Sequence, residues 1–161
     1  MSIEAVRAYL EPFGLADRVR EFDTSSATVE LAAQAAGVIP ARIAKSLSFK
    51  VDGRPVLIVA AGDAKVDNRK FKDNFHTKAT MLTPDEAVEM LGHAVGGVCP
   101  FALKEGVDVY LDVSLKRFET VLPAAGTSSS CVELTCDELE RSACHFMGWG
   151  DFCKAWQEAE V

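Results

Sequence analysis

The sequence predicts a single compact α/β domain over residues 1–161, in which helices flank a mixed, mainly antiparallel and barrel-like sheet. Three observations carry this prediction. Strand-like runs at residues 43–51 and 56–61 are joined by an Asp-Gly pair, which is typical of an antiparallel hairpin. Residues 83–86 and 135–138 each have the Thr-x-x-Glu pattern of a capping box that opens a helix. The later apolar runs are short and alternate, as in strands.

The first part of the chain is predicted to contain two helices before the hairpin. Apolar residues recur at helical spacing over residues 3–11, and a short strand over residues 19–22 follows. The hydroxyl side chains at residues 24–26 are expected to cap an alanine-rich helix that Gly37 ends. Pro40 then opens one further turn before the hairpin.

The first hairpin strand, "IAKSLSFKV", places a lysine on its apolar face. Alternation puts Lys45, Leu47, Phe49 and Val51 on one face, and Ser46, Ser48 and Lys50 on the other. A lysine at the start of a strand often lays its stem over apolar neighbours and keeps its ammonium in water. An amine taken out of water instead has a lowered pKa, unless an anion or carbonyl groups compensate. Both interpretations of Lys45 are open on the strand pattern.

After the hairpin the sequence predicts two more helices, several short strands and a final helix. "GHAVGGVCPFAL" shows no clear period and reads as a loop. The expected elements are helices over 67–75 and 83–91, an extended segment over 78–82, strands over 107–113, 118–122 and 131–134, a loop over 123–130, and a C-terminal helix from 135.

Composition indicates an ordinary soluble protein. The chain is 48% apolar and 25% charged, and no run approaches the roughly 18 apolar residues that a membrane span needs. Because the N-terminus lacks a basic region followed by an apolar core, no secretory signal is visible, and we expect a cytoplasmic protein. The five cysteines form no C-x-x-C pair and the three histidines have no ligand spacing, so we expect reduced thiols and neither a metal nor another cofactor.

The charge distribution permits a polyanionic partner despite a net charge of −7. Residues 41–80 hold nine basic and four acidic side chains, a local balance of +5. Lys and Arg side chains neutralise nucleic-acid phosphates. A solvated helix face is the other interpretation of "DNRKFKDNF".

The stretch "GGVCP", Gly96, Gly97, Val98, Cys99 and Pro100, is a second candidate site. Adjacent glycines can leave backbone N–H groups open to a carbonyl oxygen or a developing oxyanion. An ordinary turn before a proline gives the same pattern. Cys99 could also act as a nucleophile with His93 as its base, although the spacing does not fix that pair.

Three stretches together resemble the YbaK/EbsC family, the prolyl-tRNA synthetase-associated editing domains. They are "RIAKSLSFK" at 42–50, "GGVCPF" at 96–101 and "FETVLPAAGTSSSCVEL" at 118–134, and the similarity runs from about residue 20 to residue 140. The resemblance implies a compact α/β domain that hydrolyses the ester between a wrongly attached amino acid and tRNA, chiefly tRNA(Pro). Such a chain would resemble a freestanding member, with tRNA as its partner and prolyl-tRNA synthetase as a second candidate partner.

The resemblance also implies roles for particular residues. Lys45 matches the family's essential lysine, and the G-x-x-x-P loop that holds the aminoacyl carbonyl and terminal ribose matches Gly96 to Pro100. Ser46 stands where some alanine-removing members have asparagine, and the loop with Gly126 and Ser128 would shape the amino-acid pocket. That loop reads "AAGTSSS" and departs from the "SGGKRG" of the cysteine-removing branch. This departure disfavours cysteine relative to alanine, 2-aminobutyrate and serine, and all four are kept as candidate side chains.

Family members generally use neither a metal nor a covalent enzyme intermediate, which disfavours Cys99 as a nucleophile. Two further interpretations stay open at the level of sequence. The protein could bind aminoacyl-tRNA or another nucleotide without catalysis, or it could be a hydrolase or redox protein that depends on Cys99.

Overall fold

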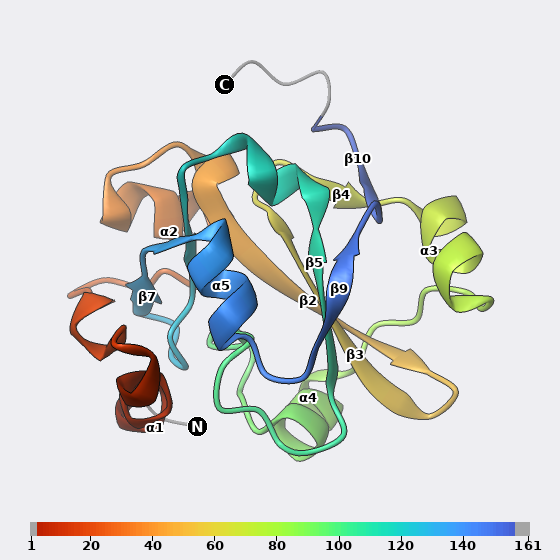
Figure 1. The fold of residues 1–161 in the computed structure, drawn as a ribbon, viewed down its shortest axis with the longest axis horizontal. Helices are drawn as coiled ribbons and strands as arrows, with labels where there is room; N and C mark the ends of the chain where they lie inside the picture. The colour runs from red at the N-terminus through yellow and green to blue at the C-terminus, as the bar shows by residue number, and fades with distance from the viewer. Residues whose placement is uncertain (1–2, 157–161) are drawn as a thin grey trace.

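A six-stranded mixed sheet forms the centre of the fold in the computed structural model, which describes residues 3–156 (Figure 1). Its strand order is β8-β6-β2-β3-β5-β9. The strands are β2 (Ile43–Val51), β3 (Arg54–Ala61), β5 (Asp108–Asp112), β6 (Thr120–Pro123), β8 (Leu134–Thr135) and β9 (Phe146–Gly150).

The predicted hairpin is confirmed and forms the longest ladder of the sheet. β2 and β3 pair antiparallel from Ala44 opposite Ala61 to Val51 opposite Arg54. Asp52 and Gly53 connect them with φ angles of 51° and 78°. Two successive positive φ angles are the geometry of a tight hairpin turn whose twist matches that of the strands.

The sheet is mixed, as predicted, but its parallel content is larger than the sequence suggested. Three of the five pairings in the central sheet are parallel: β2 with β6, β3 with β5, and β5 with β9. Antiparallel pairings are the majority, four of seven, only when two small sheets are included. These are β1 (Val19–Glu21) with β7 (Ser130–Val132), and β4 (Lys65–Val66) with β10 (Cys153–Lys154). The edge strands β8 and β9 do not pair with each other, so the sheet does not close into a barrel.

The α-helices lie where the sequence predicts them. Both capping boxes are present, at Thr83 with Glu86 and at Thr135 with Glu138. The cap of the second helix is Thr28, whose Oγ1 accepts a hydrogen bond from the Leu31 N–H, so the expected cap at residues 24–26 is wrong. The helices are α1 (Ile3–Leu10), α2 (Val29–Ala36), α3 (Asn68–Phe75), α4 (Pro84–Leu91) and α5 (Cys136–Ser142), with 3-10 turns at Glu11–Phe13, Ala16–Arg18, Pro40–Arg42 and Val113–Arg117.

Within residues 3–156, no helix has both the length and the apolar character needed to cross a membrane.

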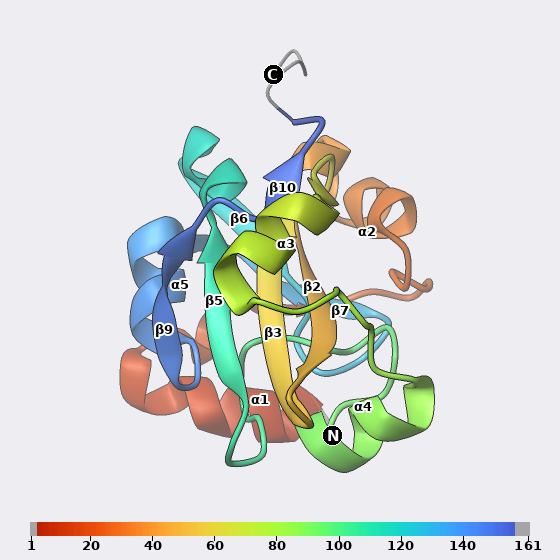
Figure 2. The same cartoon turned by 90° about the vertical axis from the view of Figure 1, so that its right-hand side faces the viewer.

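The two faces of the central sheet are covered by different elements. Figure 2 shows α3 lying across the strands on one side, with α1 and α5 on the other. On the α3 side Phe49 of β2 packs on Phe71, with ring centroids 4.8 Å apart, and Phe75 packs on Tyr110 of β5 at 5.1 Å. The face of β2 that carries Phe49 therefore belongs to the aromatic α3 layer, and the face that carries Ser46 and Ser48 looks the other way.

The sequence missed the last two strands. The chain continues after α5 into β9, which pairs parallel with β5, and then into β10. Glycines at 148 and 150 give β9 little strand character, because glycine has no side chain to pack. The expected strand over 131–134 is split between β7 and β8, which join different sheets.

Candidate active site

A cavity of about 270 Å³ lies on the serine face of β2. Five parts of the chain enclose it. The β2 segment from Ile43 to Ser48 forms one wall, residues 26–29 at the start of α2 form a second, and residues 95–98 form a third. Met81 and Leu82 close one end, and the cavity is also lined by Leu122, Ala124, Ser130 and Cys131.

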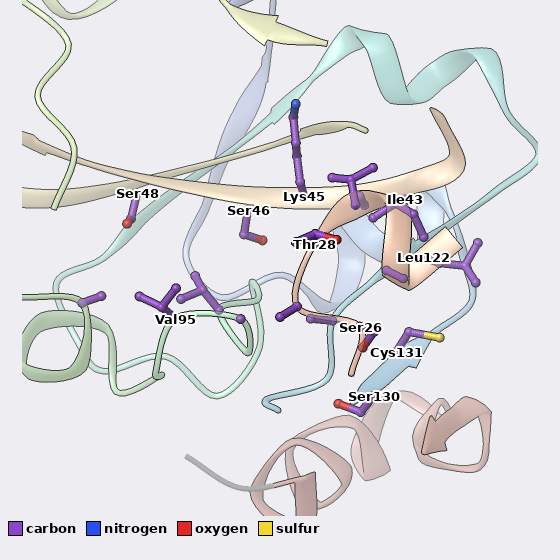
Figure 3. A pocket seen from close by; sticks show the side chains of 18 of the residues that line it. Ser26, Thr28, Ile43, Lys45, Ser46, Ser48, Val95, Leu122, Ser130 and Cys131 are labelled. Carbon is purple, nitrogen blue, oxygen red and sulfur yellow. The ribbon is translucent and has the colours of Figure 1, made fainter. Parts of the chain in front are cut away.

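Ser46 presents an unpaired hydroxyl to this cavity. Figure 3 shows the Ser46 and Ser48 side chains on the cavity side of β2, facing the loop that carries Val95. The Oγ of Ser46 is buried and has no hydrogen-bond partner within residues 3–156. A buried hydroxyl without a partner costs about 1–3 kcal/mol, which a bound ligand can recover. Ser46 is thus suited to bind a ligand.

Lys45 lies at the same cavity, but its ammonium lies on the opposite face of β2. Figure 3 shows the Lys45 side chain directed away from Ser46 and the other labelled side chains. Lys45 Nζ donates hydrogen bonds to the carbonyl oxygens of Gly62, at 3.3 Å, and Ala64. The predicted alternation along β2 is therefore confirmed. Burial lowers the pKa of Lys45, and the nearby carboxylates of Asp63 and Glu30 oppose this shift.

An ion pair fixes the turn that receives Lys45. The guanidinium of Arg117 donates two hydrogen bonds to the Asp63 carboxylate, at 2.6 and 3.0 Å, and a third at 2.9 Å to the Ser114 carbonyl. Both charged side chains are largely buried, with 16% and 22% of their surfaces exposed. The two-point geometry holds the carbonyls of Gly62 and Ala64 toward the lysine.

The G-x-x-x-P loop reaches the cavity through only two of its five residues, Gly96 and Val98. A Cβ on Gly97 would lie 2.5 Å from the Gly126 carbonyl oxygen, and the Gly97 N–H already donates to the Ala94 carbonyl at 3.0 Å. The expectation that both glycines open the backbone to a ligand is therefore wrong for Gly97. Its missing side chain lets two loops pack backbone against backbone.

The loop with Gly126 and Ser128 holds the cavity wall in place and does not line it. The Ser128 carbonyl accepts hydrogen bonds from the N–H of Ser26, at 2.5 Å, and from its hydroxyl, at 3.1 Å. Ser130 and Cys131, further along, line the cavity instead. No sequence motif marked residues 26–28 as part of a site, because their position depends on contacts of Ser26 with Ser128 in a distant loop.

Cys99 and Pro100 lie behind the cavity wall that Gly96 and Val98 form, and they do not line the cavity. Cys99 Sγ is 3.6 Å from His93 Nε2, so the pair considered from sequence does form, but both residues are fully buried and neither lines the cavity. His93 Nε2 is also 2.8 Å from the Phe101 carbonyl oxygen, to which it donates. Burial raises the pKa of the Cys99 thiol to about 12, so it is neutral at physiological pH. This geometry disfavours Cys99 as a nucleophile.

Among residues 3–156, no three His, Cys, Asp or Glu side chains are grouped so that they could hold a metal ion.

Comparisons with known proteins identify the family of this chain. Residues 23–142 match the model of the aminoacyl-tRNA editing domain family. An uncharacterized protein of Bacillus subtilis (strain 168), YwhH, is 52% identical over 158 residues, which cover 98% of this chain and all of that protein. The proline–tRNA ligase of Geobacillus sp. (strain WCH70) is 34% identical over 90 residues, which are 55% of this chain and 16% of the ligase.

Solved structures show the same fold. A protein described as a candidate trans-editing enzyme for prolyl tRNA synthetase superposes with a TM-score of 0.85 at 29% identity, covering 96% of this chain and 99% of that one. The hypothetical protein APE2540 superposes with a TM-score of 0.82 at 25% identity, covering 93% and 99%. With a family model that spans most of the chain and a matching fold, this protein belongs to the aminoacyl-tRNA editing domain family.

Proposed function

We propose that the protein is a trans-acting aminoacyl-tRNA deacylase, which hydrolyses the ester of a tRNA carrying a wrongly attached amino acid. The observation that carries this proposal is the cavity of about 270 Å³, which brings the Lys45–Ser46 strand and the Gly96–Pro100 loop together in a chain of the editing-domain family. The names of its relatives support tRNA(Pro) as the tRNA and prolyl-tRNA synthetase as a second partner. The cytoplasm is the proposed place of action.

The proposed chemistry is attack by a positioned water molecule on the ester carbonyl. An aminoacyl ester is already activated, so orientation and modest electrostatic help suffice. Backbone N–H groups in the cavity wall around Gly96 and Val98 would polarise the carbonyl oxygen. Lys45 is the proposed catalytic residue, as a positive charge that holds the terminal phosphate and ribose or stabilises developing charge. A direct contact requires its side chain to leave the carbonyls of Gly62 and Ala64.

The cavity favours a small amino-acid side chain. Its walls combine hydroxyl groups with apolar side chains such as Leu82, Val98 and Leu122. Alanine, 2-aminobutyrate, serine and cysteine are therefore the candidate substrates on tRNA(Pro).

A deacylation assay tests the proposal directly. tRNA(Pro) is charged separately with alanine, 2-aminobutyrate, serine, cysteine and proline, and ester loss is followed with and without protein. We expect accelerated hydrolysis of at least one non-cognate ester and not of the prolyl ester. Tight binding of these tRNAs with no hydrolysis of any would favour a non-catalytic binding module.

In the same assay the Cys99→Ser variant should retain deacylase activity. Loss of that activity in the variant would favour the cysteine-dependent mechanism.

A further inference from the structure

The hydrogen-bonding ladder along β2 has a gap that opens into the cavity. On one edge β2 pairs with β3 continuously from Ala44 to Val51. On the other edge only its two ends are paired. Ile43 and Ala44 pair with β6, while the Lys50 N–H donates to the Thr80 carbonyl at 2.8 Å and the Ser48 carbonyl accepts from the Leu82 N–H at 3.1 Å.

Ser46 is the residue whose backbone faces this gap. In a strand the N–H and C=O groups of every second residue point to the same edge. Because those of Ser48 and Lys50 point away from β3, those of Ser46 do so as well. Leu122 and Ala124 on one side of the gap, and Met81 and Leu82 on the other, all line the cavity. The Ser46 donor and acceptor are thus available at the cavity wall.

We infer that this gap binds the α-aminoacyl unit of the substrate as if it were one residue of an antiparallel strand. The Ser46 carbonyl accepts a hydrogen bond from the substrate's α-ammonium, and the Ser46 N–H donates to its ester carbonyl. The inference rests on the proposed function and assigns the atoms that recognise the substrate.

The chemistry of the ligand matches that of the gap. An α-amino ester carries its N–H donor and its C=O acceptor on one Cα, as a strand residue does. Two residues in a hydrogen-bonded antiparallel pair exchange both bonds, so a single aminoacyl unit can satisfy Ser46 completely. The bond to the ester carbonyl also polarises the atom that water attacks.

The same pairing places the amino-acid side chain. Side chains of directly opposed antiparallel residues lie on the same face of a sheet. The side chain of an L-amino acid would therefore lie beside the Ser46 hydroxyl, within the cavity and on the face shared with Ser48 (Figure 3). An N–H donor on the Cα of the substrate is required for this mode, so an ester that lacks the α-amino group should be rejected.

A binding experiment on the wild-type protein tests the inference without relying on catalysis. The probe is 3′-deoxy-3′-(L-alanylamino)adenosine, a stable amide that retains the α-amino group and the carbonyl. In ¹⁵N–¹H spectra we expect the Ser46 amide proton to move downfield and its exchange with solvent to slow when the probe binds. The Lys50 amide is the matched control, because it is already bonded to Thr80.

The form of the same probe without the α-amino group, 3′-deoxy-3′-(propanoylamino)adenosine, is the second arm, because it lacks the N–H donor that the Ser46 carbonyl would accept from. Loss of a hydrogen bond to a charged group should weaken its binding on the order of tenfold to a hundredfold. Equal affinity for the two probes, or an unmoved Ser46 amide at saturation, would overturn the inference.

An enzymatic comparison separates this inference from the proposed function. Hydrolysis of alanyl-tRNA(Pro) and propanoyl-tRNA(Pro) is measured, each rate divided by the enzyme-free rate of the same ester, because loss of the α-ammonium alone slows ester loss. We expect acceleration of the alanyl ester only. Equal acceleration of both would overturn the inference and leave the deacylase proposal standing. If neither is accelerated, nor any other aminoacyl ester tested above, the deacylase proposal fails and the binding of the two probes still decides the inference.

Discussion

Lys45 and Ser46 are neighbours in the chain but act on opposite faces of β2. Ser46 offers a buried, unpaired hydroxyl to the cavity, while the Lys45 ammonium is held by two carbonyl groups beyond it. Substitutions at either position therefore change different things: the shape and polarity of the cavity at Ser46, and the charge beside the cavity at Lys45.

Replacement of Lys45 separates a charge role from a proton-transfer role. Lys45→Ala should lower kcat/KM for the preferred ester by at least about tenfold, the equivalent of one charge-assisted hydrogen bond. Lys45→Arg keeps the charge but cannot release a proton at accessible pH, so retained activity would indicate a charge role. Urea unfolding of both variants controls for stability. Wild-type kcat/KM in both would remove Lys45 from the site.

The buried His93 is expected to make the folded protein less stable in acid. Burial lowers the pKa of His93, so the folded state binds its proton less readily than the unfolded state does. The contribution of neutral His93 to the free energy of unfolding is complete above the unfolded-state pKa of about 6.5. It is lost as the pH falls toward the lower pKa of the folded state, by at most about 1.4 kcal/mol per pH unit.

The comparison of wild type with His93→Gln measures this effect. Gln can keep a donor near the Phe101 carbonyl but does not titrate. The free energy of urea unfolding at pH 7.5 and 5.5 should fall more for the wild type than for His93→Gln. An equal fall in both proteins would assign the acid sensitivity to other groups.

At the scale of loops and strands, the contact between the loops at Gly97 and Gly126 is expected to be sensitive to an added side chain. In Gly97→Ala the new Cβ would meet the Gly126 backbone at 2.5 Å, which should cost about 1–3 kcal/mol and impair deacylation as the wall shifts. Gly53→Ala in the hairpin is the control. Its Cβ has open space, but its φ of 78° should cost about 1–2 kcal/mol without affecting deacylation. Normal kcat/KM in Gly97→Ala would show that the wall tolerates the shift.

The Asp63–Arg117 ion pair should contribute more to the stability of the fold than an exposed ion pair does. Asp63→Asn leaves a largely buried guanidinium without its carboxylate, and we expect a loss of about 1.5–3 kcal/mol in thermal or urea unfolding. Glu21→Gln removes the exposed pair with Arg7, whose side chains are 59% and 42% exposed, and should change stability by less than about 1 kcal/mol. Similar effects of the two substitutions would contradict this ranking.

At the scale of the whole molecule, the charge distribution predicts weak and salt-sensitive tRNA binding. Within residues 3–156, ion pairs engage four of the nine basic side chains of the 41–80 segment, at Arg42, Lys50, Arg54 and Lys70. The exposed Lys65, Arg69, Lys72 and Lys78 have no such partner within 4 Å in that part of the chain. Four phosphate contacts would give a slope of about −3 in log K against log salt concentration.

Charge reversal on α3 tests which surface is used. Arg69→Glu with Lys72→Glu should weaken tRNA binding and flatten the salt dependence, whereas Lys104→Glu, outside the segment, should change neither beyond its effect on net charge. An equal effect of Lys104→Glu would mean that the segment has no special role and that α3 is simply a solvated helix face.

The local elements could be predicted from the amino-acid sequence alone. The hairpin, both capping boxes, the alternation along β2 and the family resemblance depend on residues close together in the chain, where side-chain period and turn geometry act directly. The other features became visible in the three-dimensional fold alone. Gly97 packs on Gly126, Cys99 lies behind the cavity wall, β9 joins β5, and the edge of β2 away from β3 is unpaired at Ser46. Each of these depends on which distant backbone lies alongside, and the pattern of a single segment carries no record of its partner.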